Sequence, residues 1–147
     1  MAHRIPASLL TAFLVGGALA ACASSPELSR AVPITELGVG DCFSSDAELT
    51  VATLAASCET PHLYEVMSTT PSALGEVYPG EEALVAEADA VCSAGFEGLG
   101  RDTVAGLVAL HLVPSEASWT NGDRDVACLL AASDGTELTG SRLPTGS

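Results

Sequence analysis

The segment PGEEALVAEADAVCSAGFEGLG, residues 79–100, decides the fold expected for this chain. Its apolar and small side chains recur at the three- and four-residue spacing of one helix face, at Leu84, Ala88, Val91, Cys92, Gly95, Phe96 and Leu99. The acids Glu81 and Glu82 suit the positive end of a helix dipole, and the glycines at 98 and 100 suit its end. The sequence therefore predicts one amphipathic helix over residues 80–98, with Cys92 on its buried face.

Short runs of apolar and β-branched residues around this helix predict strands. They cover residues 49–54, 62–68, 107–113 and 126–132, and we expect an edge strand at 136–141. The runs 107–113 and 126–132 are nearly unbroken, which is typical of strands covered on both faces. Residues 38–43 are expected to form a tight turn, 44–48 and 71–78 loops, and 119–124 a turn. The prediction is an α+β fold, a small, mostly antiparallel sheet with one packed helix.

The N-terminal 21 residues have the pattern of a secretory signal peptide. Arg4 and the amino terminus give a short positive start, and residues 7–20 are uncharged. This run of 14 residues is too short to span a bilayer core of about 30 Å. It leads into Leu19-Ala20-Ala21-Cys22, which resembles the lipobox of bacterial lipoproteins.

The lipobox resemblance implies cleavage before Cys22 and a thioether-linked diacylglyceryl group on its sulfur. Two fatty acyl chains, such as palmitate, anchor a protein stably, whereas one chain is marginal. We therefore expect the chain to be held by lipid at the extracytoplasmic face of the cell membrane. An uncleaved membrane anchor and a plain secreted protein are the alternatives.

The mature chain is expected to comprise a flexible tether at residues 22–36, one extracytoplasmic domain at 37–142 and a disordered tail at 143–147. It keeps all 19 acids, four arginines and no lysine, so its formal net charge is −15. Because no basic stripe offsets repulsion by phosphate, we expect no nucleic-acid partner. The simplest interpretation of the charge is solubility, and a cationic partner or metal ions are the alternative.

Four cysteines remain beside Cys22, at Cys42, Cys58, Cys92 and Cys128. In an exported chain they indicate two disulfides, for which three connectivities exist. We favour Cys42–Cys58, which would fix the domain entry to the end of the strand 49–54. We favour Cys92–Cys128, which would clamp the helix onto a central strand. Zinc is the competing use, but the sequence has no Cys-x2–4-Cys pair, so we expect no metal and no cofactor.

His62 is the strongest candidate for chemistry, because a histidine near an acid, here Glu65, can be a general base or a ligand. In a strand, however, positions 62 and 65 face opposite sides. The alternative role of His62 is a hydrogen bond that orders the turn after Pro61. A Cys–His nucleophile pair would need a free thiol, and the serines stand in no Gly-x-Ser-x-Gly elbow.

Trp119, Asp123 and Arg124 form the candidate interaction surface, since tryptophan and arginine near a turn are residue types that dominate binding hot spots. His62 is grouped with this surface as a further contact. The alternative is that Trp119 packs under the hairpin while Asp123 and Arg124 pair locally.

Other polar residues favour structural roles. His111 stands in an apolar run and is expected to be a core or edge residue. The pair Glu81-Glu82 suits the helix dipole better than a glycosidase carboxylate pair. The acids at 41, 46 and 48 lack the calcium-loop pattern.

A set of short motifs resembles the septum formation domain family over roughly residues 37–142. The motifs are Gly40-Asp41-Cys42-Phe43, Cys58 with Pro61-His62 and Glu65-Val66, Tyr78-Pro79-Gly80, Cys92, Trp119 with Gly122-Asp123-Arg124, Cys128, and Gly140-Ser141. The resemblance implies an extracytoplasmic domain of high-GC Gram-positive bacteria, an envelope location and a link to cell division. It implies no agreed reaction, ligand or catalytic residues.

Three functions are consistent with these observations. The first is a non-catalytic binding or scaffold module that meets an envelope or division protein during septum formation or cell-wall growth. The second is an envelope hydrolase with an unrecognised site, and the third is a carrier or sensor of a small molecule. A carrier requires an apolar pocket of several hundred Å3.

Overall fold

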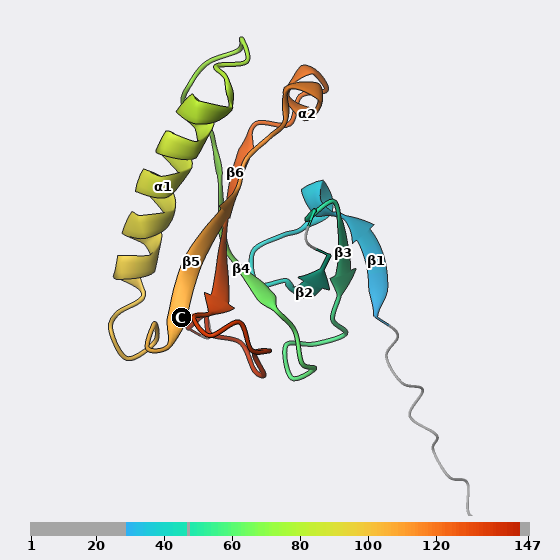
Figure 1. Cartoon of the computed structure of the whole chain (residues 1–147), viewed down its shortest axis with the longest axis vertical. Coiled ribbons are helices and arrows are strands. Elements are labelled where there is room, and N and C mark those ends of the chain that lie inside the picture. The colour runs from blue at the N-terminus through green and yellow to red at the C-terminus, as the bar shows by residue number, and fades with distance from the viewer. Residues whose placement is uncertain (1–28, 47, 145–147) are drawn as a thin grey trace, which may run out of the picture.

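The computed structural model describes residues 29–46 and 48–144 (Figure 1). In chain order its elements are β1 (Arg30–Pro33), the 3-10 turn η1 (Ile34–Glu36), β2 (Cys42–Ser45), β3 (Val51–Leu54), β4 (Tyr64–Pro71), α1 (Glu81–Gly98), β5 (Leu107–Leu112), α2 (Glu116–Thr120) and β6 (Asp125–Ala132). The six strands form one sheet in the order β1-β3-β2-β4-β6-β5, with every neighbouring pair antiparallel. The predicted α+β fold, an antiparallel sheet with one main helix, is confirmed.

The helix α1 occupies the predicted segment, and its fully buried residues are Leu84, Ala88 and Cys92, one every four positions. Gly80 leads into it with φ 95°, a left-handed conformation that glycine adopts without steric cost. Gly100, at φ 85°, turns the chain away after the last helical residues. The periodicity therefore predicts the position of the helix correctly, and three of the seven residues of the predicted face are buried.

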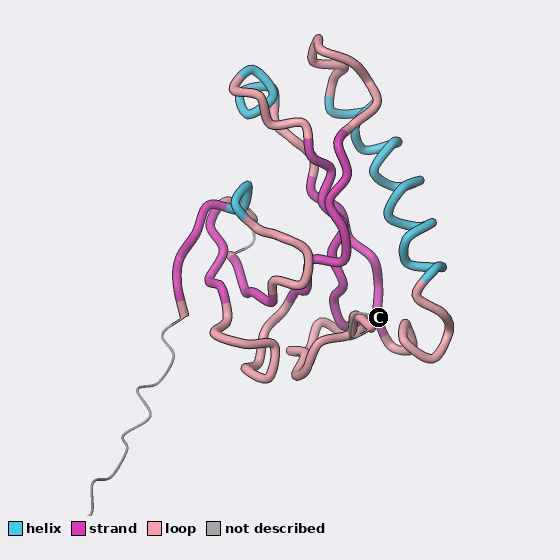
Figure 2. The backbone as a smooth tube through the Cα atoms, turned by 180° about the vertical axis from the view of Figure 1, so that it is seen from behind, coloured by secondary structure: helices cyan, strands magenta, loops and turns pink. Residues whose placement is uncertain are grey.

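The core is divided between the two faces of the sheet, because successive strand residues point to opposite sides. On the face that α1 covers, one cluster consists of Met67, Ala88, Cys92, Val126, Cys128 and Leu130. The second cluster, on the other face, consists of Val32, Phe43, Ala52, Val66 and Leu129. From behind, α1 lies on one side of the long strands, and the β1–β3–β2 portion lies on the other (Figure 2). The long strands β4 and β6 contribute to both clusters.

The first strand, β1, lies within the segment expected to be tether, so the folded domain begins by residue 30 rather than at residue 37. β1 pairs with β3, with Arg30 opposite Leu54 and Pro33 opposite Val51. Prolines discourage helix, but they are tolerated in an edge strand, where one side of the backbone needs no partner. The expected boundary of the tether is therefore corrected.

Three further strands differ from the sequence expectation. β2 lies where a turn and a polar loop are predicted, since a strand of four residues is too short to show clear alternation. β4 continues past residue 68 to Pro71, because it stays paired with β6 as far as Asp125. β5 lies at an edge of the sheet and is not covered on both faces, and Val108 and Leu110 are 37% and 40% exposed.

The predicted edge strand at 136–141 is not formed, and its one sheet-like contact is a bridge between His62 and Leu138. Asp134 Oδ1 accepts hydrogen bonds from Thr136 N at 3.0 Å and Thr136 Oγ1 at 2.7 Å. Such local bonds hold a backbone in a turn and compete with strand pairing. The short helix α2 similarly replaces the start of the predicted turn 119–124, with Ser115 as its cap.

The side-chain and backbone hydrogen bonds from Thr136 lower the pKa of Asp134 below the ordinary value of an aspartate, since they favour the ionised carboxyl group. We expect Thr136→Val to raise this pKa, because it removes the side-chain donor. A lowered folded pKa contributes stability above the pKa of the unfolded chain, and this stability is lost as pH falls through the folded value. A carbon-13 NMR titration of the Asp134 carboxyl measures the change; identical curves for the two proteins would contradict the prediction.

Both expected disulfides are confirmed. Cys42–Cys58 and Cys92–Cys128 each have Cα atoms 5.3 Å apart. The first bond joins β2 to the turn that follows β3, and the second joins α1 to β6. The second bond therefore connects the helix layer directly to the sheet.

The two ends of the chain are described only in part. The signal peptide at 1–21, Cys22 and the beginning of the tether lie outside the described residues, so the lipobox stays a prediction. Leu143, expected in a disordered tail, packs against the core on the helix side. Across residues 29–46 and 48–144, no helix combines the length and apolar character needed to cross a membrane.

Candidate functional site

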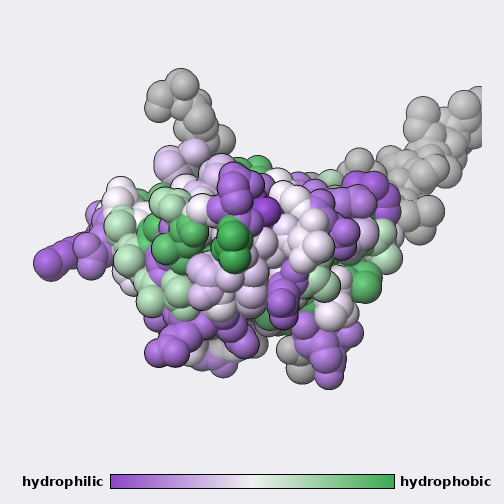
Figure 3. Space-filling model, turned by 90° about the horizontal axis from the view of Figure 1, so that it is seen from above, coloured by the Kyte–Doolittle hydropathy of each residue, from purple (hydrophilic) through white to green (hydrophobic). Residues whose placement is uncertain are grey.

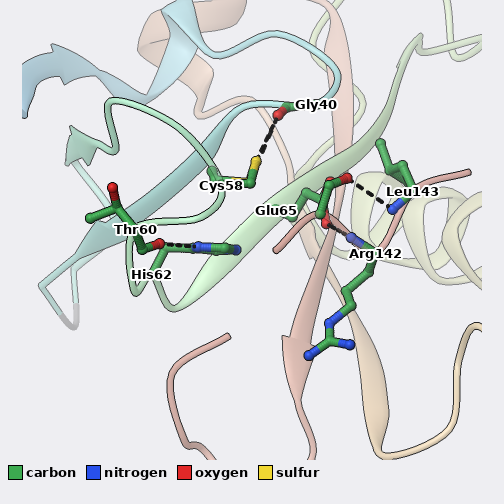
Figure 4. The surroundings of a disulfide bond; sticks show 9 residues. Gly40, Cys58, Thr60, His62, Glu65, Arg142 and Leu143 are labelled. Carbon is green, nitrogen blue, oxygen red and sulfur yellow. Dashed lines mark hydrogen bonds between the residues drawn. A yellow bond between two sulfur atoms is a disulfide. The ribbon is translucent and has the colours of Figure 1, made fainter. Parts of the chain in front are cut away.

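His62 is fully buried just before β4. It orders the turn after Pro61, which is the structural role predicted as the alternative to catalysis. Its Nδ1 lies 2.8 Å from the carbonyl oxygen of Thr60, so Nδ1 carries the proton and donates (Figure 4). Its backbone exchanges two hydrogen bonds with Leu138, at 3.1 and 2.7 Å. Nε2 is buried and has no hydrogen-bond partner within the described residues. These contacts hold the imidazole ring of His62 in the protein interior.

Glu65 is also fully buried, and it holds the C-terminal segment. Ser141 Oγ donates a hydrogen bond to Glu65 Oε1. Arg142 N donates to Oε2 at 2.6 Å (Figure 4). On the neighbouring strand, Cys42 lies opposite Glu65 in the sheet register. Both carboxyl oxygens of Glu65 therefore hold the C-terminal segment in place, at residues 141 and 142.

The region around His62 and Glu65 is better suited to a structural role than to a catalytic one. His62 and Glu65 are both 0% exposed, so a substrate has no access to either side chain in this conformation. Cys42, Cys58 and Glu65 place possible metal-ligand atoms within 4.8 Å of one another, the one such group found among the described residues. The two sulfurs are bonded to each other, and a metal ligand would have to be a thiolate.

Trp119 is 2% exposed and packs under the loop that precedes α1. Its Nε1–H donates to the carbonyl oxygen of Glu76 at 2.9 Å, and Tyr78 meets its ring edge-on with centroids 5.9 Å apart. The guanidinium of Arg124 lies over the indole, with Cζ 4.1 Å from the ring centroid. The packing interpretation of Trp119 therefore describes the ring better than the exposed hot spot that the sequence suggests.

Arg124 is turned inward as well. Its guanidinium donates to the carbonyl oxygens of Trp119, Asp123 and Glu76. Through these contacts the Arg124 side chain holds the loop before α1 against α2. Of the four residues predicted as an interaction surface, including His62, Asp123 alone lines the open hollow described next.

That hollow is a cleft of about 500 Å3 between η1 and the end of β5, here named the η1–β5 cleft. Ile34 and Thr35 form one wall, and Leu112, Val113 and Pro114 form the other. A narrower part continues over Leu37, Thr69 and Ala127 on the sheet face that α1 leaves uncovered. The lining of the cleft comes from η1, which follows the edge strand β1, and from the end of β5, the other edge strand.

The rim of the η1–β5 cleft is acidic. Glu48, Glu81, Asp123 and Asp125 line it, and among its lining residues there is no lysine or arginine. His111, which also lines the cleft, has its Nδ1 3.1 Å from a carboxyl oxygen of Asp89 on α1. From above, patches of apolar residues are bordered by hydrophilic ones (Figure 3). The cleft thus combines apolar walls with negative charge.

Sequence reasoning identified three of the acids that meet at this cleft, but for other roles. Glu81 lies in the first turn of α1, as expected from the helix dipole. Glu48 is one of the three acids that lack the calcium-loop pattern, and Asp123 belongs to the predicted surface near Trp119. The apolar walls were missed, because Ile34 lies in the segment expected to be tether and Leu112 in a strand expected to be covered.

The fold and these sites define a small disulfide-linked domain with a buried polar cluster and an open, acidic apolar cleft. A family model described as Septum formation matches residues 39–146. The chain belongs to the Septum formation family, which connects it with septum formation. No curated protein and no solved structure matches the chain.

Proposed function

We propose that this chain is a non-catalytic binding module of the cell envelope, anchored by lipid on Cys22, that contributes to septum formation by docking a partner protein. Family membership supports the connection with septum formation. The observation that supports the proposal is a difference in solvent accessibility between two regions of the protein. His62 and Glu65 are buried, whereas the η1–β5 cleft is open and apolar. A docking function needs an accessible surface and requires no reactive group.

The lipid anchor follows from Leu19-Ala20-Ala21-Cys22 and agrees with the charge of the domain. A mature chain of formal net charge −15 is repelled by an anionic membrane surface, so the acyl chains would supply the attraction. We expect Cys22→Ala to move the protein out of the membrane fraction, while Ser24→Ala leaves it there. Immunoblots of fractionated cells measure this distribution. Equal membrane association of both variants would contradict lipid anchoring.

A structural role for His62 predicts that His62→Ala lowers the free energy of unfolding by about 2 kcal/mol, because it removes a buried ring and its hydrogen bond. Urea unfolding followed by the fluorescence of Trp119, the single tryptophan, measures the change. His111→Ala is the matched control on an edge strand, and a smaller loss is expected. A His62→Ala protein of unchanged stability that has lost an enzymatic reaction would favour the hydrolase instead.

Proximity labelling from the full, anchored chain in growing cells tests the role in division. We expect the labelled proteins to include components of the division machinery and the label to concentrate at septa. A labelling enzyme carried by an unrelated lipoprotein anchor is the control for abundance at the envelope. The same labelled set from both proteins would contradict a specific role at the septum.

A further inference from the structure

We propose that the η1–β5 cleft binds an extended segment of a partner protein in which arginine or lysine alternates with apolar residues. This inference rests on the proposed docking function and specifies the chemistry of the partner. It depends on three properties of the cleft, namely apolar walls, an acidic rim and a free strand edge.

The apolar walls continue along β5. Residues 108, 110 and 112 point to the same face of the strand, because strand side chains alternate. Val108 and Leu110 are 37% and 40% exposed there, and they line a second hollow of about 250 Å3 with Leu63 and Tyr64. Leu112 then leads into the η1–β5 cleft. A surface that extends along a strand suits an extended segment better than a compact small molecule, which needs an enclosing pocket.

The acidic rim selects the charge of the occupant. Glu48, Glu81 and Asp123 line the cleft, and no lysine or arginine is among its lining residues. The guanidinium of Arg124, which follows Asp123 in the chain, lies over the Trp119 ring and donates to backbone carbonyl oxygens. A second copy of this chain would bring two proteins of formal net charge −14 or below together and set acid against acid. A basic segment gains attraction at the same rim, which guides encounter and disfavours acidic competitors.

The free edge of β5 favours an extended backbone. Within the described part of the chain, β5 pairs with β6 and has no strand on its other side. Its residues, LVALHL, include no proline or lysine, the residues that commonly block edge pairing. An added strand gains backbone hydrogen bonds at such an edge, while its alternate side chains supply specificity. Apolar side chains would then meet the walls, and the long basic ones would reach the rim.

The test uses the full chain in detergent and a fluorescein-labelled ten-residue peptide that alternates leucine or valine with arginine. The cleft variant combines Glu48→Gln, Glu81→Gln and Asp123→Asn, and the asparagine keeps the oxygen that accepts from Asp125 N. The matched control combines Glu137→Gln, Glu97→Gln and Asp102→Asn, which makes the same charge change at exposed positions outside the cleft lining. We expect about tenfold weaker binding for the cleft variant and less than twofold for the control.

A second variant, Thr35→Arg, places bulk and positive charge at an exposed position of the cleft wall without disturbing the core. Loss of binding in both cleft variants supports the inference. Equal weakening by the control triple variant, stronger binding of an analogous peptide with glutamate in place of arginine, or self-association blocked by Thr35→Arg would overturn it. Septal labelling is measured separately, so a failure of peptide binding with septal labelling retained rejects the partner chemistry and leaves the docking function intact.

Discussion

Replacing Cys92 and Cys128 together by alanine is expected to lower the free energy of unfolding by about 4 kcal/mol, because the unfolded chain loses the closure of a loop of this length. The two residues are 36 positions apart, and both are buried, at 3% and 0% exposure. Alanine is the suitable replacement, since it leaves no unpaired polar atom in the core. Trp119 is 2% exposed, so urea unfolding can be followed by its fluorescence.

The double variant Cys42→Ala and Cys58→Ala is the matched control, since it also removes one disulfide. Its loop spans 16 residues, and the expected loss is smaller, about 3 kcal/mol. The two variants differ further in hydrogen exchange. Loss of Cys92–Cys128 should expose the amides of α1 to faster exchange, because that bond joins the helix to β6. A cost below about 1 kcal/mol for the Cys92 and Cys128 variant would contradict a clamping role.

The helix and the disulfides were predictable because each depends on a pattern within one segment or on a simple count. Cys92 lies on the apolar face of α1, and Cys128 lies in an apolar run, so the layer arrangement brings them together. The runs that became β3, β5 and β6 were equally clear. Strand order was not predictable, because the position of β5 at an edge depends on pairing between distant segments.

The η1–β5 cleft could not be predicted from the sequence, because it is assembled from separate segments. Ile34 follows β1, Glu48 precedes β3, and Leu112 ends β5. No local pattern marks these residues as neighbours. Their meeting along one cleft is a property of the complete fold.

The motifs that identify the family converge on two structural clusters. In the first, the carbonyl oxygen of Cys58 accepts a hydrogen bond from Gly140 N at 2.7 Å, and Glu65 accepts one from Ser141. In the second, Tyr78 and Arg124 pack around the ring of Trp119. Both clusters hold distant segments of the chain together. The family motifs are therefore explained by their structural role in the fold, and the η1–β5 cleft is left as the accessible site.

Glu65→Ala is expected to lower the free energy of unfolding by about 3 kcal/mol, because it removes a buried side chain whose carboxyl group accepts two hydrogen bonds. Ser141 Oγ and Arg142 N both donate to the carboxyl group of Glu65. Ser141→Ala removes one of these bonds and should cost about 1 kcal/mol. Glu137→Ala is the control, since Glu137 is exposed, and a change within about 0.5 kcal/mol is expected there.

Trypsin gives an independent measure of the same contact, because it cleaves after arginine and Arg142 N is held by Glu65 at 2.6 Å. In Glu65→Ala the segment around residue 142 is released, so cleavage after Arg142 should accelerate under native conditions. Cleavage after Arg101, in the loop between α1 and β5, is the internal reference and should stay unchanged. Equal stability of Glu65→Ala and Glu137→Ala, with unchanged cleavage after Arg142, would show that the buried carboxyl group does not fasten the C-terminal segment.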